Sequence, residues 1–257
     1  MIEFSANLGF LWTDLPLVEA IAAAANAGFD AVECHCPYDV PAAAVRQALS
    51  DAGSQMLSLN TRTGGEGEIG VAALPGRETQ AREYIDEAIA YAVDIGCGAV
   101  SVVAGISGRT EVAEHVYQEN LAYATAQASP YDITVLIEPL NTSVSPDYHL
   151  VSADAACETI MAVGASNLKV MLDTFHASKM HGDLEPLFAR VIDHVGHVQF
   201  ASIPDRAEPN GGVVDYGALL PHVVELGYDR PFGAEYTPRV GVEDGLGWMN
   251  QLRGGAS

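Results

Sequence analysis

Short apolar runs alternate with amphipathic helical patterns along the whole chain, and this alternation limits the folds that the chain can adopt. We expect strands at 2–7, 30–34, 56–61, 99–104, 135–138, 170–173, 197–199 and 232–235. Helical patterns lie between and after them, starting near 16 and 78 and spanning 41–52, 111–128, 152–163, 183–191, 216–226 and 243–252. Repeated strand–helix units of this kind are typical of a parallel sheet that is covered by helices.

Glycines mark the points where helices should end. Five of them come just before an expected strand: Gly28, Gly53, Gly96, Gly164 and Gly227. Because glycine adopts the left-handed conformation that ends a helix at little steric cost, these positions predict five helix-to-strand turns. Eight strands in 257 residues suit one (β/α)8 TIM barrel, a single domain that spans residues 1–257. An open sheet of six to eight strands is the alternative.

The loops that follow the strands are expected to be longer than the turns that precede them. Three of these loops, at 62–77, 140–151 and 201–215, are long and chemically mixed. A barrel whose site lies at the carboxyl ends of its strands has this asymmetry. We therefore expect the functional site at that mouth.

One loop contains a motif that we reject as a nucleotide-binding signature. Gly65-Glu-Gly67-Glu-Ile-Gly70 satisfies the GxGxxG pattern. No helix is expected to begin within it, and its two glutamates would repel a pyrophosphate. We expect a mobile loop over the barrel mouth that brings Glu68 and Arg77 to the substrate.

Four successive strands end in a side chain that carries an oxygen: Glu138, Asp173, Gln199 and Glu235. In a barrel these four strand-end residues should converge at one mouth. Three carboxylates and an amide favour Mg²⁺ or Mn²⁺, and a divalent cation would offset the repulsion between the carboxylates. The alternative is that each carboxylate caps a helix or pairs with an arginine. The metal prediction requires Glu138 and Glu235 to point toward one space that has room for an ion and is not filled by an arginine.

Charge and composition restrict the class of partner. Thirty-four acidic and twelve basic residues give a net charge of −22, which repels nucleic acid and anionic membranes, so we expect a small diffusible molecule. The four cysteines form neither a CxxC metal motif nor a disulfide framework, and we see no secretion signal, so we expect a cytoplasmic protein. No apolar stretch is long enough to span a bilayer. The sequence leaves open whether the chain forms a homo-oligomer.

Several short segments match a known pattern: Ile137-Glu-Pro-Leu-Asn141, Asp173-Thr-Phe-His176, Gly196-His-Val-Gln199, Asp205-Arg-Ala-Glu-Pro209 and Gly233-Ala-Glu-Tyr236. With these segments the chain resembles the xylose-isomerase-type barrels, and among them it is most similar to the hydroxypyruvate isomerase family. Ser5-Ala-Asn7 and Leu74-Pro-Gly-Arg-Glu78 fit the same family. The resemblance therefore covers nearly the whole chain.

The resemblance implies roles for particular residues. The four strand-end residues would bind a divalent metal, and two of them, Glu138 and Glu235, would act as acid and base on the substrate. The related ketohexose epimerases have a histidine where Gln199 stands, so glutamine favours the hydroxypyruvate isomerase branch. By the same resemblance, His176 and Arg206 would contact the substrate.

The implied chemistry is the isomerisation of a small 2-oxo-3-hydroxy acid, with hydroxypyruvate giving tartronate semialdehyde through an enediolate. A proton leaves the hydroxyl-bearing carbon and another returns to the former carbonyl carbon, while a metal stabilises the charge on both oxygens. A 2-oxo-tetronate isomerase or a ketose 3-epimerase on the same barrel is the alternative. An abasic-site endonuclease conflicts with the negative charge, and a non-catalytic binder of small acids has little need of two opposed glutamates.

The substrate of such an isomerase is an anion, so a basic side chain should bind its carboxylate. Arg206 or Lys179 can do so, and the planar guanidinium of arginine suits a carboxylate better. The alternative for Arg206 is a local ion pair with Asp205 or Glu208. For His176 it is a hydrogen-bonded place in the core.

Overall fold

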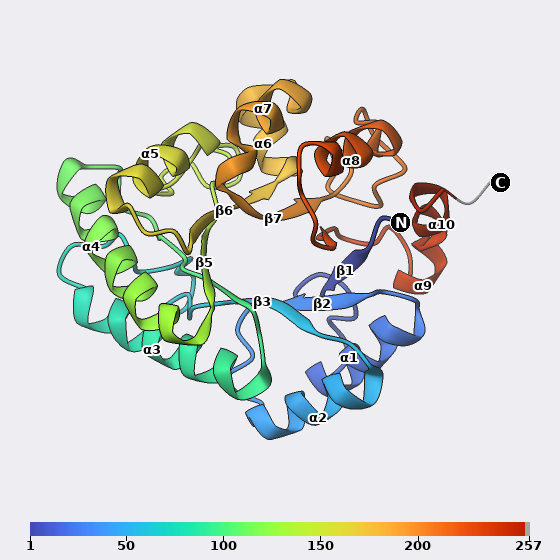
Figure 1. Ribbon diagram of the computed structural model, residues 1–257, viewed down its shortest axis with the longest axis horizontal. Coiled ribbons are helices and arrows are strands. Elements are labelled where there is room, and N and C mark those ends of the chain that lie inside the picture. The colour runs from blue at the N-terminus through green and yellow to red at the C-terminus, as the bar shows by residue number, and fades with distance from the viewer. Residues whose placement is uncertain (255–257) are drawn as a thin grey trace.

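Eight parallel strands close into a barrel, in sequence order, in the computed structural model, which describes residues 1–254 (Figure 1). The strands are β1 (Phe4–Asn7), β2 (Ala31–Cys34), β3 (Met56–Asn60), β4 (Ala99–Ser101), β5 (Thr134–Ile137), β6 (Leu168–Asp173), β7 (Val195–Phe200) and β8 (Phe232–Ala234). β1 pairs with both β2 and β8, which closes the ring. The predicted (β/α)8 barrel is confirmed and the open sheet is excluded.

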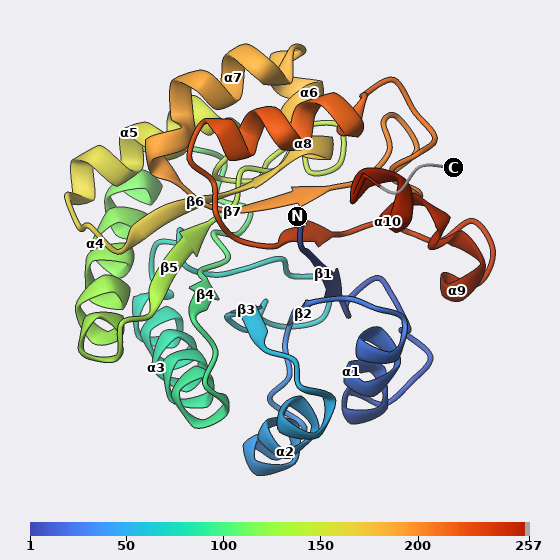
Figure 2. The ribbon, with the colours of Figure 1, turned by 45° about the vertical axis from the view of Figure 1, so that its right-hand side comes forward.

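The helices form a layer outside the barrel (Figures 1 and 2). They are α1 (Leu17–Asn26), α2 (Ala42–Ala52), α3 (Glu78–Ile95), α4 (Glu111–Ala128), α5 (Ala153–Val163), α6 (Thr174–His181), α7 (Leu184–Val191), α8 (Tyr216–Glu225), α9 (Val242–Gly245) and α10 (Gly247–Leu252), with short 3₁₀ turns η1 (Ser129–Tyr131) and η2 (Ile192–His194). Helix α3 buries Ile85, Ala88, Ile89 and Ala92, a spacing of three and four residues that places them on the face toward the strands. Among the described residues, none of the helices has both the length and the apolar character that crossing a bilayer requires.

The five predicted glycine turns are confirmed. Gly53, Gly96 and Gly164 are the C-cap residues of α2, α3 and α5, with φ values of 60°, 75° and 72°. Gly28 and Gly227 come one residue after the caps of α1 and α8, with φ values of 93° and 107°. These angles lie in the region where a side chain would be strained.

Two helical segments differ from the prediction. Helix α6 was not expected, because it begins directly after β6 and has no loop before it. Its first turn is capped by Asp173, whose Oδ1 accepts a hydrogen bond of 2.8 Å from the backbone N–H of Phe175. The single helix expected at 243–252 is divided into α9 and α10, and the division falls at Gly245-Leu-Gly247, where glycine weakens the helix.

The apolar core lies between the strands and the helices, and a smaller group fills the barrel itself. That inner group consists of Ala99, Leu136 and Met171 from three neighbouring strands. Toward the carboxyl ends of the strands the interior becomes polar, with Ser5, Glu33 and several other hydrogen-bonding side chains buried there. The buried polar side chains therefore gather toward the mouth where sites of such barrels lie.

The long strand-to-helix loops are fastened to one another at that mouth. Gly70 of the β3–α3 loop forms an isolated bridge with Ala104, and Ile106 forms another with Tyr148 of the β5–α5 loop. A Cβ atom on Gly70 would lie 2.4 Å from the carbonyl oxygen of Val103, so only glycine allows this approach. These two bridges connect three loops around the site, and the expected mobility of the β3–α3 loop ahead of Gly70 stays a prediction.

Candidate active site

The four strand-end residues lie at the carboxyl end of the barrel, as predicted. Asp173 ends β6 and Gln199 is the last residue but one of β7, and the two are register partners, while Glu138 and Glu235 directly follow β5 and β8. Asp173, Gln199 and Glu235 are at most 5% exposed, and Glu138 is half-buried. Carboxylates this deeply buried require positive charge or hydrogen-bond donors nearby.

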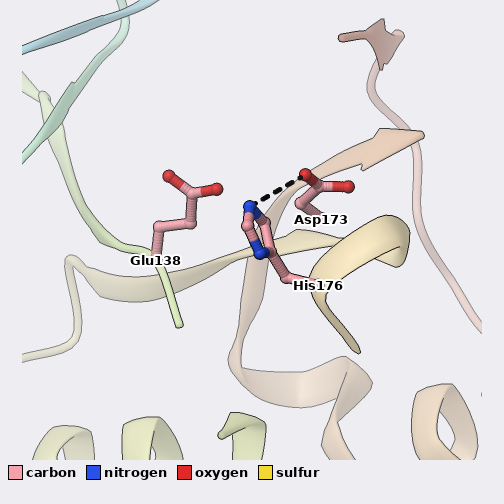
Figure 3. A group of neighbouring side chains, drawn as sticks. All are labelled: Glu138, Asp173 and His176. Carbon is pink, nitrogen blue, oxygen red and sulfur yellow. Dashed lines mark ion pairs between the residues drawn. The ribbon is translucent and has the colours of Figure 1, made fainter. Parts of the chain in front are cut away.

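Glu138, Asp173 and His176 form a compact group whose possible ligand atoms all lie within 4.8 Å of one another. Figure 3 shows the ring of His176 between the two carboxylates, with its Nε2 3.6 Å from Asp173 Oδ2. The backbone N–H of Asn141 donates to His176 Nδ1 at 3.1 Å, so Nδ1 carries the lone pair and the neutral ring carries its proton on Nε2. Burial lowers the pKa of His176, which favours this neutral form. His176 therefore presents an N–H donor to the site.

Arg206 supplies positive charge to two of the carboxylates. Its Nη2 lies 2.8 Å from Asp173 Oδ2 and 2.8 Å from Glu235 Oε1. The guanidinium carbon is 4.7 Å from the centre of the Phe10 ring and 5.0 Å from that of Phe175, so two aromatic faces hold it. The expected alternative of carboxylates paired with an arginine thus describes Asp173 and Glu235, and Glu235 is not part of the compact group that Glu138, Asp173 and His176 form.

The local ion pairs that were the alternative for Arg206 do not form. Asp205 and Glu208 pair instead with Arg239, at 2.7 Å each. This frees Arg206 to point into the barrel mouth. Its own backbone has φ of 53°, an uncommon conformation for a residue with a side chain and one that is often found at functional sites.

One guanidinium does not balance the charge of this site. Burial, and then repulsion from Asp173, raises the pKa of Glu138 to about 8 against the opposing effect of Arg206. Burial also raises the pKa of Glu235 well above its usual range, although Arg206 lies in contact with it. The site therefore favours either protons or a further cation.

Gln199 provides an oxygen that is free to act as a ligand. Its Nε2 donates a 2.9 Å hydrogen bond to Glu33, whereas its Oε1 is buried and has no hydrogen-bond partner among the described residues. Buried polar atoms are almost always paired, so this unpaired amide oxygen beside carboxylates is open to a ligand such as a cation. Carboxylate and amide oxygens are also the ligands that Mg²⁺ and Mn²⁺ prefer, so the residues present fit such an ion.

Three residues of the site were missed from the sequence: Glu33, Asn141 and Phe10. Glu33 follows the rule that identified Glu138, since it is a carboxylate within the apolar run Ala31–Cys34. Burial raises the pKa of Glu33, but His197 and hydrogen bonds from Gln199 and Ser5 outweigh this effect and leave it below its usual value. Neither Asn141 nor Phe10 carries a comparable local signal, because their roles depend on contacts across the fold.

The remaining candidate residues lie at the rim. Arg77 and Glu68 pair with each other at 2.9 Å, and hydrogen bonds from Arg77 and then from the Gly65 N–H lower the pKa of Glu68 to about 2. Lys179 is exposed, with its Nζ 4.4 Å from the centre of the Phe175 ring. Contact of these three residues with a substrate stays a prediction. No helix begins within residues 65–70, as expected when the GxGxxG pattern was rejected.

Comparison with known proteins places this fold and site in a family. A family model described as a xylose isomerase-like TIM barrel matches residues 21–252. The chain belongs to the xylose isomerase-like TIM barrel family. The resemblance that rested on the motifs at the strand ends is thereby confirmed.

Relatives within this family match the chain over nearly its full length. A 2-oxo-tetronate isomerase from Cupriavidus necator is 39% identical, over 99% of this chain and 100% of that protein. The hydroxypyruvate isomerase of Escherichia coli is 33% identical, over 98% of this chain and 100% of that protein. A crystal structure of an AP endonuclease, family 2, from Brucella melitensis has a TM-score of 0.94 and 36% identity, over 98% of this chain and 99% of that one. The two isomerase relatives confirm the expected class of enzyme.

Proposed function

We propose that this protein is a metal-dependent isomerase of a small 2-oxo-3-hydroxy acid. The observation that carries the proposal is the unpaired, buried Oε1 of Gln199 beside Asp173, because a buried amide oxygen almost always has a partner and a cation shared with the neighbouring carboxylates would be one. The 2-oxo-tetronate and hydroxypyruvate isomerases among the relatives act, by name, on acids of this class.

The cation would be held by the four strand-end residues, Glu138, Asp173, Gln199 and Glu235. When bound, Mg²⁺ or Mn²⁺ supplies Lewis-acid stabilisation of the negative charge that develops on the two substrate oxygens. Its charge would also relieve the repulsion that raises the pKa values of Glu138 and Glu235.

Two glutamates would move the protons. One of Glu138 and Glu235 takes the proton from the hydroxyl-bearing carbon, and the other returns a proton to the former carbonyl carbon. The N–H of His176 Nε2, fixed by Asn141, would donate a hydrogen bond to a substrate oxygen as charge develops there. These groups are sufficient to exchange the positions of the carbonyl and the neighbouring hydroxyl by proton transfer alone.

Arg206 would bind the carboxylate of the acid. It forms planar, charge-assisted hydrogen bonds, and its contacts with Asp173 and Glu235 support this role because both carboxylates belong to the proposed ligand set. To accept the substrate it must release at least one of these carboxylates, which a cation at the same ligands would make possible. Cation and anionic substrate are therefore expected to favour each other's binding.

The relatives bear on the chain length of the substrate. The sequence alone favoured the three-carbon acid hydroxypyruvate, but the 2-oxo-tetronate isomerase is the more similar of the two relatives, at 39% against 33%. We therefore propose 2-oxo-tetronate as the better substrate and hydroxypyruvate as a slower one. Both have a carbonyl at C2 and a hydroxyl at C3, so the same residues serve both.

The test is proton NMR in deuterated water, first with the divalent metal ions removed by chelation and then with Mg²⁺ added. We expect deuterium exchange beside the carbonyl and isomerisation of 2-oxo-tetronate, loss of both on chelation, and recovery with metal. Glu138→Gln should lower the rate by at least ~10²-fold, the contribution of one positioned acid or base. Exchange only with a ketohexose would support the epimerase instead. Cleavage of an abasic duplex with no exchange in any acid would overturn the proposal.

A further inference from the structure

Glu33 is a buried carboxylate inside the barrel that the proposed chemistry does not use. It lies on β2 and is 1% exposed. Its Oε1 accepts a 3.1 Å hydrogen bond from Ser5 Oγ, and its Oε2 lies 3.0 Å from His197 Nε2 and 2.9 Å from Gln199 Nε2. A buried carboxylate with this many partners is held in one position.

The contact with Gln199 determines where the free amide oxygen points. A carboxylate can only accept hydrogen bonds, so it selects the NH₂ end of the amide and excludes the flipped orientation. Because the amide is planar, anchoring Nε2 on Glu33 directs Oε1 away from Glu33. The direction of the unpaired Oε1 is thus a consequence of Glu33.

The backbone of β8 leaves room for this contact. Gly233 is the register partner of both Gln199 and Ser5. A Cβ atom at Gly233 would lie 2.1 Å from Glu33 Oε1, 2.9 Å from Gln199 Cγ and 2.9 Å from His197 Nε2. Absence of a side chain at this position therefore allows three strands to bring their polar side chains together.

We infer that Glu33 is a positioning residue that holds Gln199 with its amide oxygen toward the cation site. The negative charge of Glu33 beside the NH₂ group also shifts electron density of the amide toward Oε1. This makes the amide oxygen a stronger metal ligand, an effect that outer partners of metal ligands commonly have. The inference rests on the proposed function, since it assigns Gln199 to the cation. The competing explanation is that Glu33 only forms an ion pair with His197 and that its contact with Gln199 has no consequence.

Mn²⁺ affinity, measured by isothermal titration calorimetry on the full chain, tests the inference without any assay of activity. Glu33→Gln should weaken Mn²⁺ binding by about 10- to 100-fold, the usual effect of losing such an outer partner. Loss of a nearby negative charge by itself weakens cation binding whatever residue stands at 199. The same substitution is therefore measured in a Gln199→Ala background, where we expect a loss of at most ~3-fold.

Ser5→Ala is the matched control, because it removes a hydrogen bond to Glu33 Oε1 and leaves both partners of Oε2 in place. Its Mn²⁺ affinity should stay within about 2-fold of the unmodified protein. Equal losses from Glu33→Gln in both backgrounds would overturn the inference. If the unmodified protein binds no Mn²⁺, the proposed function itself fails, so the two failures are distinct.

A crystal of the unmodified protein soaked in Mn²⁺ provides a check that does not depend on the folding of a variant. We expect Gln199 Oε1 at a ligand distance of about 2.0–2.2 Å from the ion, with Nε2 still bonded to Glu33. An ion bound by the carboxylates with Gln199 turned away from it, or with Glu33 no longer bonded to Gln199, would refute the positioning role.

Discussion

Arg206 supplies the positive charge that two carboxylates of the site require in this structure. In this structure it bridges Asp173 and Glu235, and the rings of Phe10 and Phe175 hold its guanidinium. The same two carboxylates belong to the predicted ligand set of the cation. We therefore expect Arg206 and a divalent cation to compete for at least part of the same negative charge.

Arg206→Ala should tighten the binding of Mn²⁺. Removing the guanidinium leaves two buried carboxylates without their positive partner, so their full negative charge is available to attract the cation. We expect an increase in affinity on the order of 10-fold, within the range usual for coupling between two ligands. Isothermal titration calorimetry of the metal-free protein with Mn²⁺ measures it.

Arg239→Ala is the control for this change, since Arg239 pairs with Asp205 and Glu208 and with none of the four strand-end residues. Its effect on Mn²⁺ affinity should be small. Weaker Mn²⁺ binding after Arg206→Ala would show that the arginine supports the cation site instead of competing with it.

At the scale of the elements, Glu114 connects two helices and two loops. From α4 its Oε2 lies 2.9 Å from His149 Nε2 in the β5–α5 loop, and its Oε1 accepts a 2.9 Å hydrogen bond from Thr159 of α5. The other ring nitrogen of His149 is 2.7 Å from Ser107 Oγ in the β4–α4 loop. These contacts fix the loops at one side of the mouth.

Glu114→Gln should destabilise the protein in a manner that depends on pH. The hydrogen bond to His149, opposed by burial, lowers the pKa of Glu114 to about 2, below its usual value of 4.5. A lowered carboxylate pKa contributes stability above the unfolded value, and this contribution disappears as the pH falls through the folded value. The cost of the substitution should be largest above pH 4.5 and decline toward pH 2.

Thermal unfolding at pH 7 and at pH 3 measures this dependence. We expect Tm to fall by about 2–4 °C at pH 7, since solvent screens this partly exposed carboxylate, and by less at pH 3. Glu111→Gln, in the same first turn of α4, controls for the general effect of a negative charge at a helix N-terminus. A loss of Tm that is as large at pH 3 as at pH 7 would contradict the assignment.

Prediction of the elements succeeded where the signal was local. The burial of Ile85 and Ala88 on α3 follows from their spacing, and the end of that helix follows from the backbone freedom of Gly96. Helix α6 was missed because Asp173 both ends β6 and caps the next helix, so no loop separates the two. A residue with two roles gives a sequence pattern for only one of them.

For the molecule as a whole, helix α10 packs against the barrel where β1 and β8 pair. Trp248 of α10 is fully buried, with its ring 5.0 Å from Phe4 of β1 and 5.4 Å from Phe200 of β7, both edge-to-face. Its Nε1 donates a 3.1 Å hydrogen bond to Tyr236 Oη, just after β8. Figure 1 shows α10 beside the N-terminus, where the first and last strands of the ring meet.

Trp248→Ala should therefore destabilise the whole protein. Removing a buried tryptophan leaves a cavity and costs about 3–5 kcal/mol. Urea unfolding measures the loss, with Val240→Ala as the control, because Val240 is 79% exposed and its truncation should change stability by less than about 0.5 kcal/mol. A loss below ~1 kcal/mol for Trp248→Ala would show that α10 does not stabilise the barrel.

The sequence by itself determined the repeated strand–helix units, the glycine turns and the positions of the strand-end residues such as Glu138 and Gln199. These depend on the periodicity of neighbouring residues and on the backbone freedom of glycine, which are local properties. Only the tertiary structure decided that Arg206 turns away from Asp205 toward the mouth, and that Glu33 meets Gln199 from 166 positions away. Such contacts depend on closure of the ring and on strand register, because residues remote in the chain become neighbours only when the barrel is complete.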